Sequence, residues 1–395
     1  MLPRCPACDA PAPAPFYAVT GLPVHGTAVL PDVDSARAVA VGDQSLALCA
    51  TCGVVFNRDF TDGLVDHSGR ADEPQNHSPR FAAYCAEIAA RWMDRYGLID
   101  QHVVEIGCGS GDFAAELLST GAGSMTGVDP QFTPDRVPRE LADRLTSVPE
   151  LFNAAHIDRG TAAVVCRHTL EHVPGLAAFG AEIVAGMRRG EASMLLAEVP
   201  DLGRILGEGA FWDLQFERCS YFTPTTLAAF LSGLGFDDPV VHTTYSDQYV
   251  VAEARLGSRP VATSPLPAAE LDRLAAACRA FADRVTEQTR RWRAWLAEHA
   301  DAGRSVAVWG GGAKGQTFLN VVVGEAERPA VRAVVDLNPA VGGHFTAGLG
   351  LPICGPDDLK ENPPHSVLLM NPVYLGEVRG MLDARGLGAT ELLAV

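Results

Sequence analysis

One acid and three glycines stand close together in the run Glu105-Ile106-Gly107-Cys108-Gly109-Ser110-Gly111. The apolar residues Val103 and Val104 precede this run, and residues 114–118 follow it with helical periodicity. Glycines let a ligand approach the backbone closely, and the N–H groups of such a turn lie at a helix N-terminus. The run therefore predicts a strand, a turn and a helix that together bind a nucleotide.

A second acid completes the predicted site. Ser124–Val128 is a predicted strand that leads into Asp129, at about the separation at which α/β nucleotide sites place a carboxylate on ribose hydroxyls. The dinucleotide fingerprint G-x-G-x-x-G would need its third glycine where this chain has Asp112. An ordinary tight strand–helix turn is the alternative interpretation of the glycines.

The spacing E-x-G-x-G-x-G resembles the S-adenosylmethionine (SAM) site of class I methyltransferases. In that family the acid before the glycines faces the cationic methionine end of SAM, and the later acid holds the ribose. The resemblance implies a Rossmann-like α/β domain. The SAM contacts that it implies are Glu105, Gly107, Cys108, Gly109, Gly111, Asp129 and Arg167.

The length and net charge of the chain indicate how many domains it has and which partners are excluded. A chain of 395 residues should contain two or three domains. Its net charge of −17 without a basic cluster argues against nucleic acid or an anionic membrane as a partner. No apolar stretch has the length of a signal peptide core or a membrane span, so we expect a cytoplasmic protein.

Two CxxC pairs lie near the N-terminus, Cys5 with Cys8 and Cys49 with Cys52. Each pair places two thiolates on one tight turn, and two such turns can close a tetrahedral zinc site. A closed four-thiolate site leaves no open position for catalysis, so the predicted Zn²⁺ is structural and this small domain should need it to fold. Unrelated thiols and a redox pair are the alternatives.

The middle of the chain predicts the rest of an α/β sheet. A buried strand at residues 162–166 leads into His168, Glu171 and His172, which spell the zinc motif H-x-x-E-H. Because the motif follows a strand and no third ligand is evident, we expect His168 to be a neighbour of cofactor or substrate. Further helices are predicted at 177–187 and 225–234, and strands at 194–199, 239–244 and 248–254, the last two forming an antiparallel edge.

The last third of the chain repeats the glycine pattern. Gly310, Gly312 and Gly315 fit G-x-G-x-x-G, and Val331–Val335 is a predicted strand ending at Asp336. Taken alone, this pattern predicts NAD, although Lys314 could instead give the turn a charge for a phosphate.

A long helix precedes this unit. Its apolar stripe runs from Leu271 to Trp295 and is broken at Gln288. The stripe should pack against another helix or another subunit, so a monomer and a homodimer are both compatible with it.

The three-part layout resembles the deoxysugar C-methyltransferases of antibiotic biosynthesis. The residues that carry the resemblance are the four cysteines, the segment 105–129, and segments 166–172, 211–222, 309–315 and 371–374. It implies a zinc domain with a connecting loop (1–75), a SAM methyltransferase domain (76–256), and a long helix with a Rossmann-like domain (257–395) that binds a dTDP-sugar. The substrate contacts that it implies are Gly310, Lys314, Asp336 and Tyr374.

The chain departs from this family at the reacting centre. Family members carry Y-x-E-H-x-x-Y-F, whose histidine removes a proton beside the sugar ketone. Here Gln215 holds the first tyrosine position, Arg218 holds the histidine position, and Ala71 stands near the place of a further tyrosine. Arginine stays protonated in proteins and cannot act as a base, and losing a positioned base typically costs roughly 100- to 10,000-fold in rate.

We therefore predict a SAM-dependent methyltransferase of small-molecule secondary metabolism with an altered acid–base centre. Its predicted reacting centre is Glu217, Arg218, His168 and Tyr221. Methyl transfer to a nucleophile that needs less activation, other chemistry with SAM, and binding without turnover all remain open. The alternative from another class is a dinucleotide oxidoreductase that uses the second glycine turn.

Overall fold

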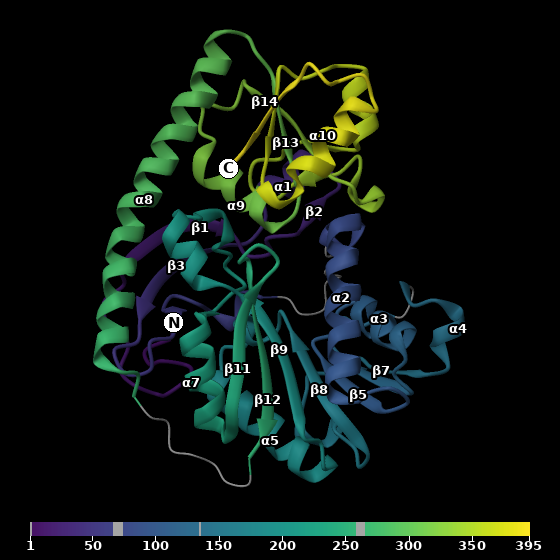
Figure 1. The fold of residues 1–395 in the computed structure, drawn as a ribbon. Coiled ribbons are helices and arrows are strands. Elements are labelled where there is room, and N and C mark those ends of the chain that lie inside the picture. Colours follow the sequence, from purple (N-terminus) through teal and green to yellow (C-terminus); the bar gives the residue numbers. More distant parts are fainter. Residues whose placement is uncertain (1, 66–73, 134–135, 258–264) are drawn as a thin grey trace.

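The computed structural model describes residues 2–65, 74–133, 136–257 and 265–395 (Figure 1). Ala71 lies outside these residues. The described part of the chain forms sheets of seven, five and four strands and one two-stranded ladder. Within it, no helix combines the length and the apolar character needed to cross a membrane.

The seven-stranded sheet carries the first glycine turn. Its order is β11-β12-β9-β8-β5-β6-β7, and β9, β8, β5, β6 and β7 are parallel. The strands are β5 (His102–Ile106), β6 (Ser124–Val128), β7 (Leu145–Val148), β8 (Thr161–Arg167), β9 (Met194–Pro200), β11 (Phe236–Thr244) and β12 (Tyr249–Leu256). The antiparallel pairing of β12 with β9 and with β11 confirms the predicted edge. Strand order reverses at β5, and such a reversal opens a ligand crevice at the carboxyl ends of the strands.

Helices cover both faces of this sheet. They are α2 (Pro79–Tyr96), α3 (Asp112–Thr120), α4 (Arg139–Ala142), α5 (Leu176–Gly190) and α7 (Pro224–Leu234), whereas α6 (Leu202–Glu208) packs against α8 (Ala268–Asp301), described below. Ile106 and Val164 pack with α5 and α7, whereas Val103 and Val165 point to the other face and pack with α2 and α3. This alternation of side chains along buried parallel strands places all their apolar residues in one of two cores.

The four-stranded sheet belongs mostly to the N-terminal segment. Its order is β1-β3-β4-β10, in strands β1 (Tyr17–Pro23), β3 (Val41–Leu48), β4 (Val55–Asn57) and β10 (Ser220–Tyr221). The last strand comes from the central segment, which also contains the seven-stranded sheet. After β1, β2 (Val29–Leu30) pairs with β15 (Phe345–Thr346) of the C-terminal segment, and α1 (Val33–Arg37) follows β2. Strands thus pair across the predicted boundaries at residues 75 and 256, and those boundaries stay a prediction.

The C-terminal segment has its own parallel sheet, ordered β16-β14-β13-β17-β18. Its elements are β13 (Val306–Trp309), α9 (Ala313–Val322), β14 (Val331–Val335), β16 (Ile353–Cys354), β17 (Ser366–Leu369), α10 (Leu375–Asp383) and β18 (Glu391–Ala394). The second predicted glycine turn therefore also connects a strand to a helix, here β13 to α9.

Helix α8 (Ala268–Asp301) runs along the side of the N-terminal and C-terminal sheets (Figure 1). The helix continues through Gln288, whose amide donates to the carbonyl of Glu208 at 3.4 Å, so only the apolar stripe is interrupted there. Phe281, Val285 and Trp292 are buried against α6, α9 and β1. Packing within the chain therefore covers the stripe.

Candidate active site

The first glycine turn joins β5 to α3 in a conformation that only glycine adopts easily. Gly107, Gly109 and Gly111 have φ of 72°, 52° and 81°. Asp129, at the end of β6, accepts hydrogen bonds from the N–H of Gly109 at 3.0 Å and from the N–H of Gln131 at 2.8 Å. A hydrogen bond from the backbone N–H of Gly109 thus holds the acid of the predicted SAM site against the glycine turn.

A side chain at position 107 should disrupt this turn. A Cβ there would lie 1.9 Å from Thr169 Oγ1, which donates to the carbonyls of Ile106 and Arg167, and the backbone would also be strained. Gly107→Ala is expected to lower the free energy of unfolding by about 1–3 kcal/mol in urea denaturation and to weaken SAM binding. Gly376→Ala is the control, because a Cβ in α10 meets no atom within 4 Å. Unchanged stability and affinity in Gly107→Ala would contradict this account of the turn.

Glu105 lies at the end of β5 with its carboxyl group buried against the cavity described below. Its Oε2 has no hydrogen-bond partner among the described residues. Burial, opposed by Arg167 and reinforced by Asp112 and Asp129, raises the pKa of Glu105 to about 8. A buried, unsatisfied carboxyl of this kind fits the cationic methionine end of SAM, which would supply both a donor and a positive charge.

Arg167 and His168 end β8 beside the same turn. The Arg167 guanidinium lies 2.9 Å from Glu198 Oε1 and 3.9 Å from the ring centre of Phe113. His168 has φ of 49°, and its Nε2 lies 2.7 Å from Glu198 Oε1 while its Nδ1 lies 3.6 Å from Glu171 Oε1. His168 is therefore held between two carboxylates.

The histidine that completes H-x-x-E-H lies elsewhere. His172 Nδ1 lies 3.1 Å from the backbone oxygen of Glu217. His172 therefore contacts a different segment from the two carboxylates that flank His168. Among the described residues, a cluster that could hold a metal forms only at the four N-terminal cysteines. The role of His168 as a neighbour of cofactor or substrate stays a prediction.

Removing the charge of His168 should destabilise the protein in a pH-dependent way. Burial opposes the charged ring, but Glu171 and Glu198 raise the pKa of His168 from 6.5 to about 9. Because the folded-state pKa is the higher one, this stabilisation is fully present below about pH 6.5 and disappears as the pH rises through 9. Urea denaturation of His168→Gln should show a deficit in unfolding free energy at pH 6 that closes above about pH 10.

The control for this experiment is His344→Gln, which alters a turn of the C-terminal domain outside the cavity. It should change the free energy of unfolding little at either pH. A deficit of equal size for His168→Gln at pH 6 and pH 10 would show that the imidazolium does not stabilise the fold.

Three residues of the predicted reacting centre, Glu217, Arg218 and Tyr221, follow η6 (Phe211–Asp213). Glu217 Oε1 lies 2.7 Å from Nδ1 of His25, a residue that no sequence motif marks. The Arg218 guanidinium donates to the carbonyl of Asp213 at 3.0 Å. Tyr221 is buried beneath these residues, where its hydroxyl accepts from Gln44 at 2.6 Å, and it does not line the cavity.

The second glycine turn repeats the geometry of the first. Gly310 has φ of 118°, and a Cβ on Gly315 would lie 1.9 Å from the Gly310 oxygen. Asp336 is buried and accepts from the N–H of Gly311 at 2.8 Å and of Asn338 at 2.9 Å. An acid thus braces each of the two glycine turns.

Lys314 connects this turn to the central segment of the chain, which contains Asp213 and Gln248. Its Nζ lies 3.0 Å from Asp213 Oδ1 and donates to Gln248 Oε1 at 3.0 Å. Asp213 also pairs with Arg204. Burial, with Asp213 opposing and Arg204 assisting, lowers the pKa of Lys314 to about 8. At Tyr374, the hydroxyl accepts from Tyr245 at 2.9 Å, which makes a second connection between the segments.

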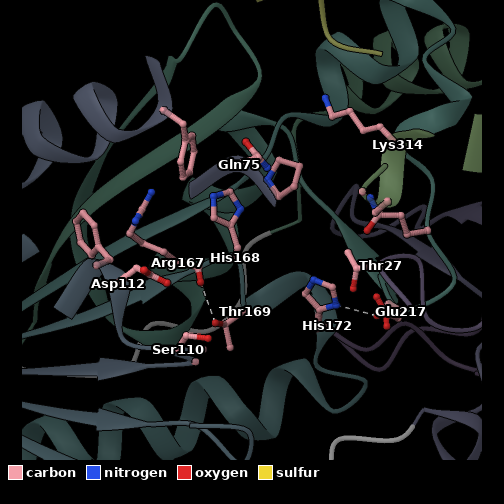
Figure 2. A pocket seen from close by; sticks show the side chains of 18 of the residues that line it. Thr27, Gln75, Ser110, Asp112, Arg167, His168, Thr169, His172, Glu217 and Lys314 are labelled. Carbon is pink, nitrogen blue, oxygen red and sulfur yellow. Dashed lines mark hydrogen bonds between the residues drawn. The ribbon is translucent and has the colours of Figure 1, made fainter. Parts of the chain in front are cut away.

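One cavity of about 650 Å³ extends from the first glycine turn to the second and is lined by most of the residues described above. Figure 2 shows Ser110, Asp112 and Arg167 on one side of it, with His172 and Glu217 on the other and Lys314 beyond them. Of the predicted site residues, the cavity is lined by Glu105, Gly107, Cys108, Gly109, Asp129, Arg167, His168, Glu217, Arg218, Gly310, Lys314, Asp336 and Tyr374. Gly111 and Tyr221 lie behind the lining.

Two family models match the chain. A methyltransferase domain matches residues 77–242, and a C-methyltransferase C-terminal domain matches residues 267–386. This chain is a SAM-dependent methyltransferase. The predicted class I fold, enzyme class and cofactor of the methyltransferase are thereby confirmed, whereas its specificity for a deoxysugar stays a prediction.

Solved structures similar to the methyltransferase overlap about half of it. Magnesium protoporphyrin IX methyltransferase from Synechocystis, with bound S-adenosylhomocysteine, is 17% identical, and the match covers 48% of this chain and 90% of that one with a TM-score of 0.34. The 1,6-didemethyltoxoflavin N1-methyltransferase of Burkholderia thailandensis is 16% identical over 52% of this chain and 96% of that one, with a TM-score of 0.35. No curated protein sequence matches the methyltransferase.

The four N-terminal cysteines of the methyltransferase form one cluster. The sulfur atoms of Cys5, Cys8, Cys49 and Cys52 all lie within 4.8 Å of one another. Their turns are closed by backbone hydrogen bonds, among them Gly53 N–H to the Cys49 oxygen at 3.0 Å. Four thiolates on two tight turns fit a structural zinc ion. The cluster packs against α5 and α7, so the metal site also supports the central domain.

Proposed function

We propose that the methyltransferase acts on a nucleotide-linked sugar or a related intermediate of secondary metabolism. The observation that carries this proposal is the single cavity that reaches from the SAM turn to the second glycine turn. Asp336 would hold the ribose of the substrate nucleotide, as Asp129 would hold that of SAM, since both acids brace a turn in the same way. The sugar would then lie between the two turns.

An altered acid–base centre is part of this proposal. Arg218 lines the cavity, and its guanidinium would stabilise negative charge that develops on the acceptor. The Arg218 guanidinium is oriented by the Asp213 carbonyl, and the side chain of Asp213 is in turn held by Lys314 and Arg204. Lys314 would orient this network and contact the substrate from the far side.

Isothermal titration of the zinc-bound protein with dTDP, in the presence of S-adenosylhomocysteine, tests the nucleotide site. We expect dTDP binding that Asp336→Ala weakens at least about 10-fold, because one lost charged hydrogen bond costs about 1.5–3 kcal/mol. Asp272→Ala, an exposed carboxylate on α8, should bind as wild type. Binding of NADH in place of dTDP would select the oxidoreductase alternative.

Transfer of a labelled methyl group from SAM to dTDP-4-keto-6-deoxyglucose tests the reaction itself. Formation of a methylated sugar nucleotide would support the proposal. Binding of dTDP and SAM without any methylated product would favour other chemistry with SAM or binding without turnover.

A further inference from the structure

The base of this active site is not at the position where family resemblance would place it. His25 and Glu217 come from the N-terminal segment and the methyltransferase segment, and both line the cavity. His25 Nδ1 lies 2.7 Å from Glu217 Oε1, within hydrogen-bond distance. We propose that His25, oriented by Glu217, is the general base that removes the proton from the methyl acceptor.

The segment that carries His25 is fixed in place. The N–H of Val24 donates to the Ala40 oxygen at 2.9 Å, and the N–H of Ala28 donates to the His25 oxygen at 3.2 Å. The Gln316 amide of α9 donates to the Ala28 oxygen at 3.1 Å. Bonds on both sides of His25 therefore hold its backbone, and a positioned base needs such support.

This segment also lies between the two glycine turns. A Cβ on Gly26 would meet Cβ of Ala313, the first residue of α9, at 3.2 Å, and Cγ of Gln215 at 3.8 Å. His25 is thus next to the C-terminal glycine turn on one side and to the Gln215–Arg218 loop on the other. An acceptor bound from the second turn would reach the cavity beside it.

Glu217 determines which nitrogen of the His25 ring carries the proton. When the Nδ1–H of His25 donates to the Glu217 carboxylate, Nε2 keeps its lone pair and is the basic nitrogen. The backbone oxygen of Glu217 is itself held by His172 at 3.1 Å. This arrangement of an imidazole oriented by a carboxylate is the usual way in which a histidine is prepared as a base.

Three other basic groups of the described cavity have partners that make them unsuitable as the base. His168 is flanked by Glu198 and Glu171, which raise its pKa to about 9 and keep it protonated near neutral pH. Lys314 is paired with Asp213, and arginine does not give up its proton. His172 contacts the backbone oxygen of Glu217, whereas His25 pairs with the Glu217 side chain, next in sequence to Arg218.

The proposed step balances as follows. Nε2 of His25 takes a proton from the acceptor, and the electron pair of the broken bond remains on the acceptor atom. That pair forms the new bond to the methyl carbon while the methyl–sulfur bond breaks, and its electrons stay on sulfur. Arg218 stabilises the negative charge on the acceptor, and the imidazolium later releases its proton to water.

The inference rests on the proposed function, and proton exchange tests it before any methyl transfer. In D₂O with S-adenosylhomocysteine, wild-type protein should exchange the proton beside the ketone of dTDP-4-keto-6-deoxyglucose. His25→Gln should slow this exchange at least about 100-fold with SAM affinity unchanged, and Glu217→Gln should slow it less. The matched control His344→Gln should exchange as wild type. Full exchange in His25→Gln, or its loss only in His172→Gln, would overturn the proposal.

A second measurement does not depend on the acceptor. Nitrogen-15 NMR of histidine-labelled, zinc-bound protein at neutral pH, assigned by the signals lost in His25→Gln, should show Nδ1 protonated and Nε2 unprotonated. A His25 protonated at Nε2 would overturn the proposal. If wild-type protein neither exchanges nor methylates the keto sugar, the assigned substrate is wrong, and the NMR result alone decides whether the dyad stands.

Discussion

Replacing Asp129 with alanine is expected to abolish SAM binding at concentrations at which the wild-type protein is saturated. The carboxylate accepts from the N–H groups of Gly109 and Gln131, so its removal frees the glycine turn as well as the position for the ribose hydroxyls. Loss of the two hydrogen bonds that the ribose hydroxyls would donate to this carboxylate costs about 3–6 kcal/mol, which corresponds to more than about 100-fold in affinity. Isothermal titration with SAM and with S-adenosylhomocysteine measures this loss.

The control is Asp283→Ala, which removes an exposed carboxylate from α8 without touching the cavity. It should bind both ligands as wild type does. Asp129→Ala that kept wild-type affinity would show that SAM binds without the acid at the end of β6, contrary to the geometry of the turn.

Loss of zinc should have the second largest effect. Cys49 ends the stretch after β3, and β3 pairs with β4, which in turn pairs with β10 next to the Gln215–Arg218 loop. We expect Cys49→Ser to lose the bound zinc and at least about 3 kcal/mol of stability, a fall of about 4 °C or more in Tm. Atomic absorption and thermal unfolding followed by circular dichroism measure the two losses.

Cys354→Ser is the matched control, because Cys354 lies in β16 of the C-terminal sheet, outside the cysteine cluster. It should keep its zinc and lower Tm much less. If Cys49→Ser retained wild-type stability, or if the wild-type protein contained no zinc, the four-thiolate site would not be structural.

Local patterns predicted the elements expected to bind SAM. The glycines between β5 and α3 and the acid after β6 are each part of a short local pattern, so they can be identified from sequence. The antiparallel edge of the sheet followed from strand spacing in the same way. Gln288 interrupts the apolar stripe of α8, but the helix continues through it. Its side chain reaches the backbone oxygen of Glu208.

The pairing of His25 with Glu217 could not be found in this way. His25 and Glu217 are separated by 192 positions, and neither belongs to a motif that names the other. Lys314 was predicted as a phosphate contact, yet its partners Asp213 and Gln248 are known only from the packing of two segments. Pairings of this kind depend on how separate sheets meet, and periodicity along the chain carries no information about that.

The ladder between β2 and β15 limits how this enzyme can be re-engineered or diversified. Because residues 29–30 pair with residues 345–346, and Gln316 holds the loop of His25, a C-terminal unit grafted from another enzyme would lose part of its own support and displace the dyad. The segments proposed to recognise the acceptor and to remove its proton would therefore have to be exchanged together. Productive chimeras would have to exchange the β1–β2 loop along with the C-terminal sheet, and recombination only at the predicted boundary after residue 256 should give inactive hybrids.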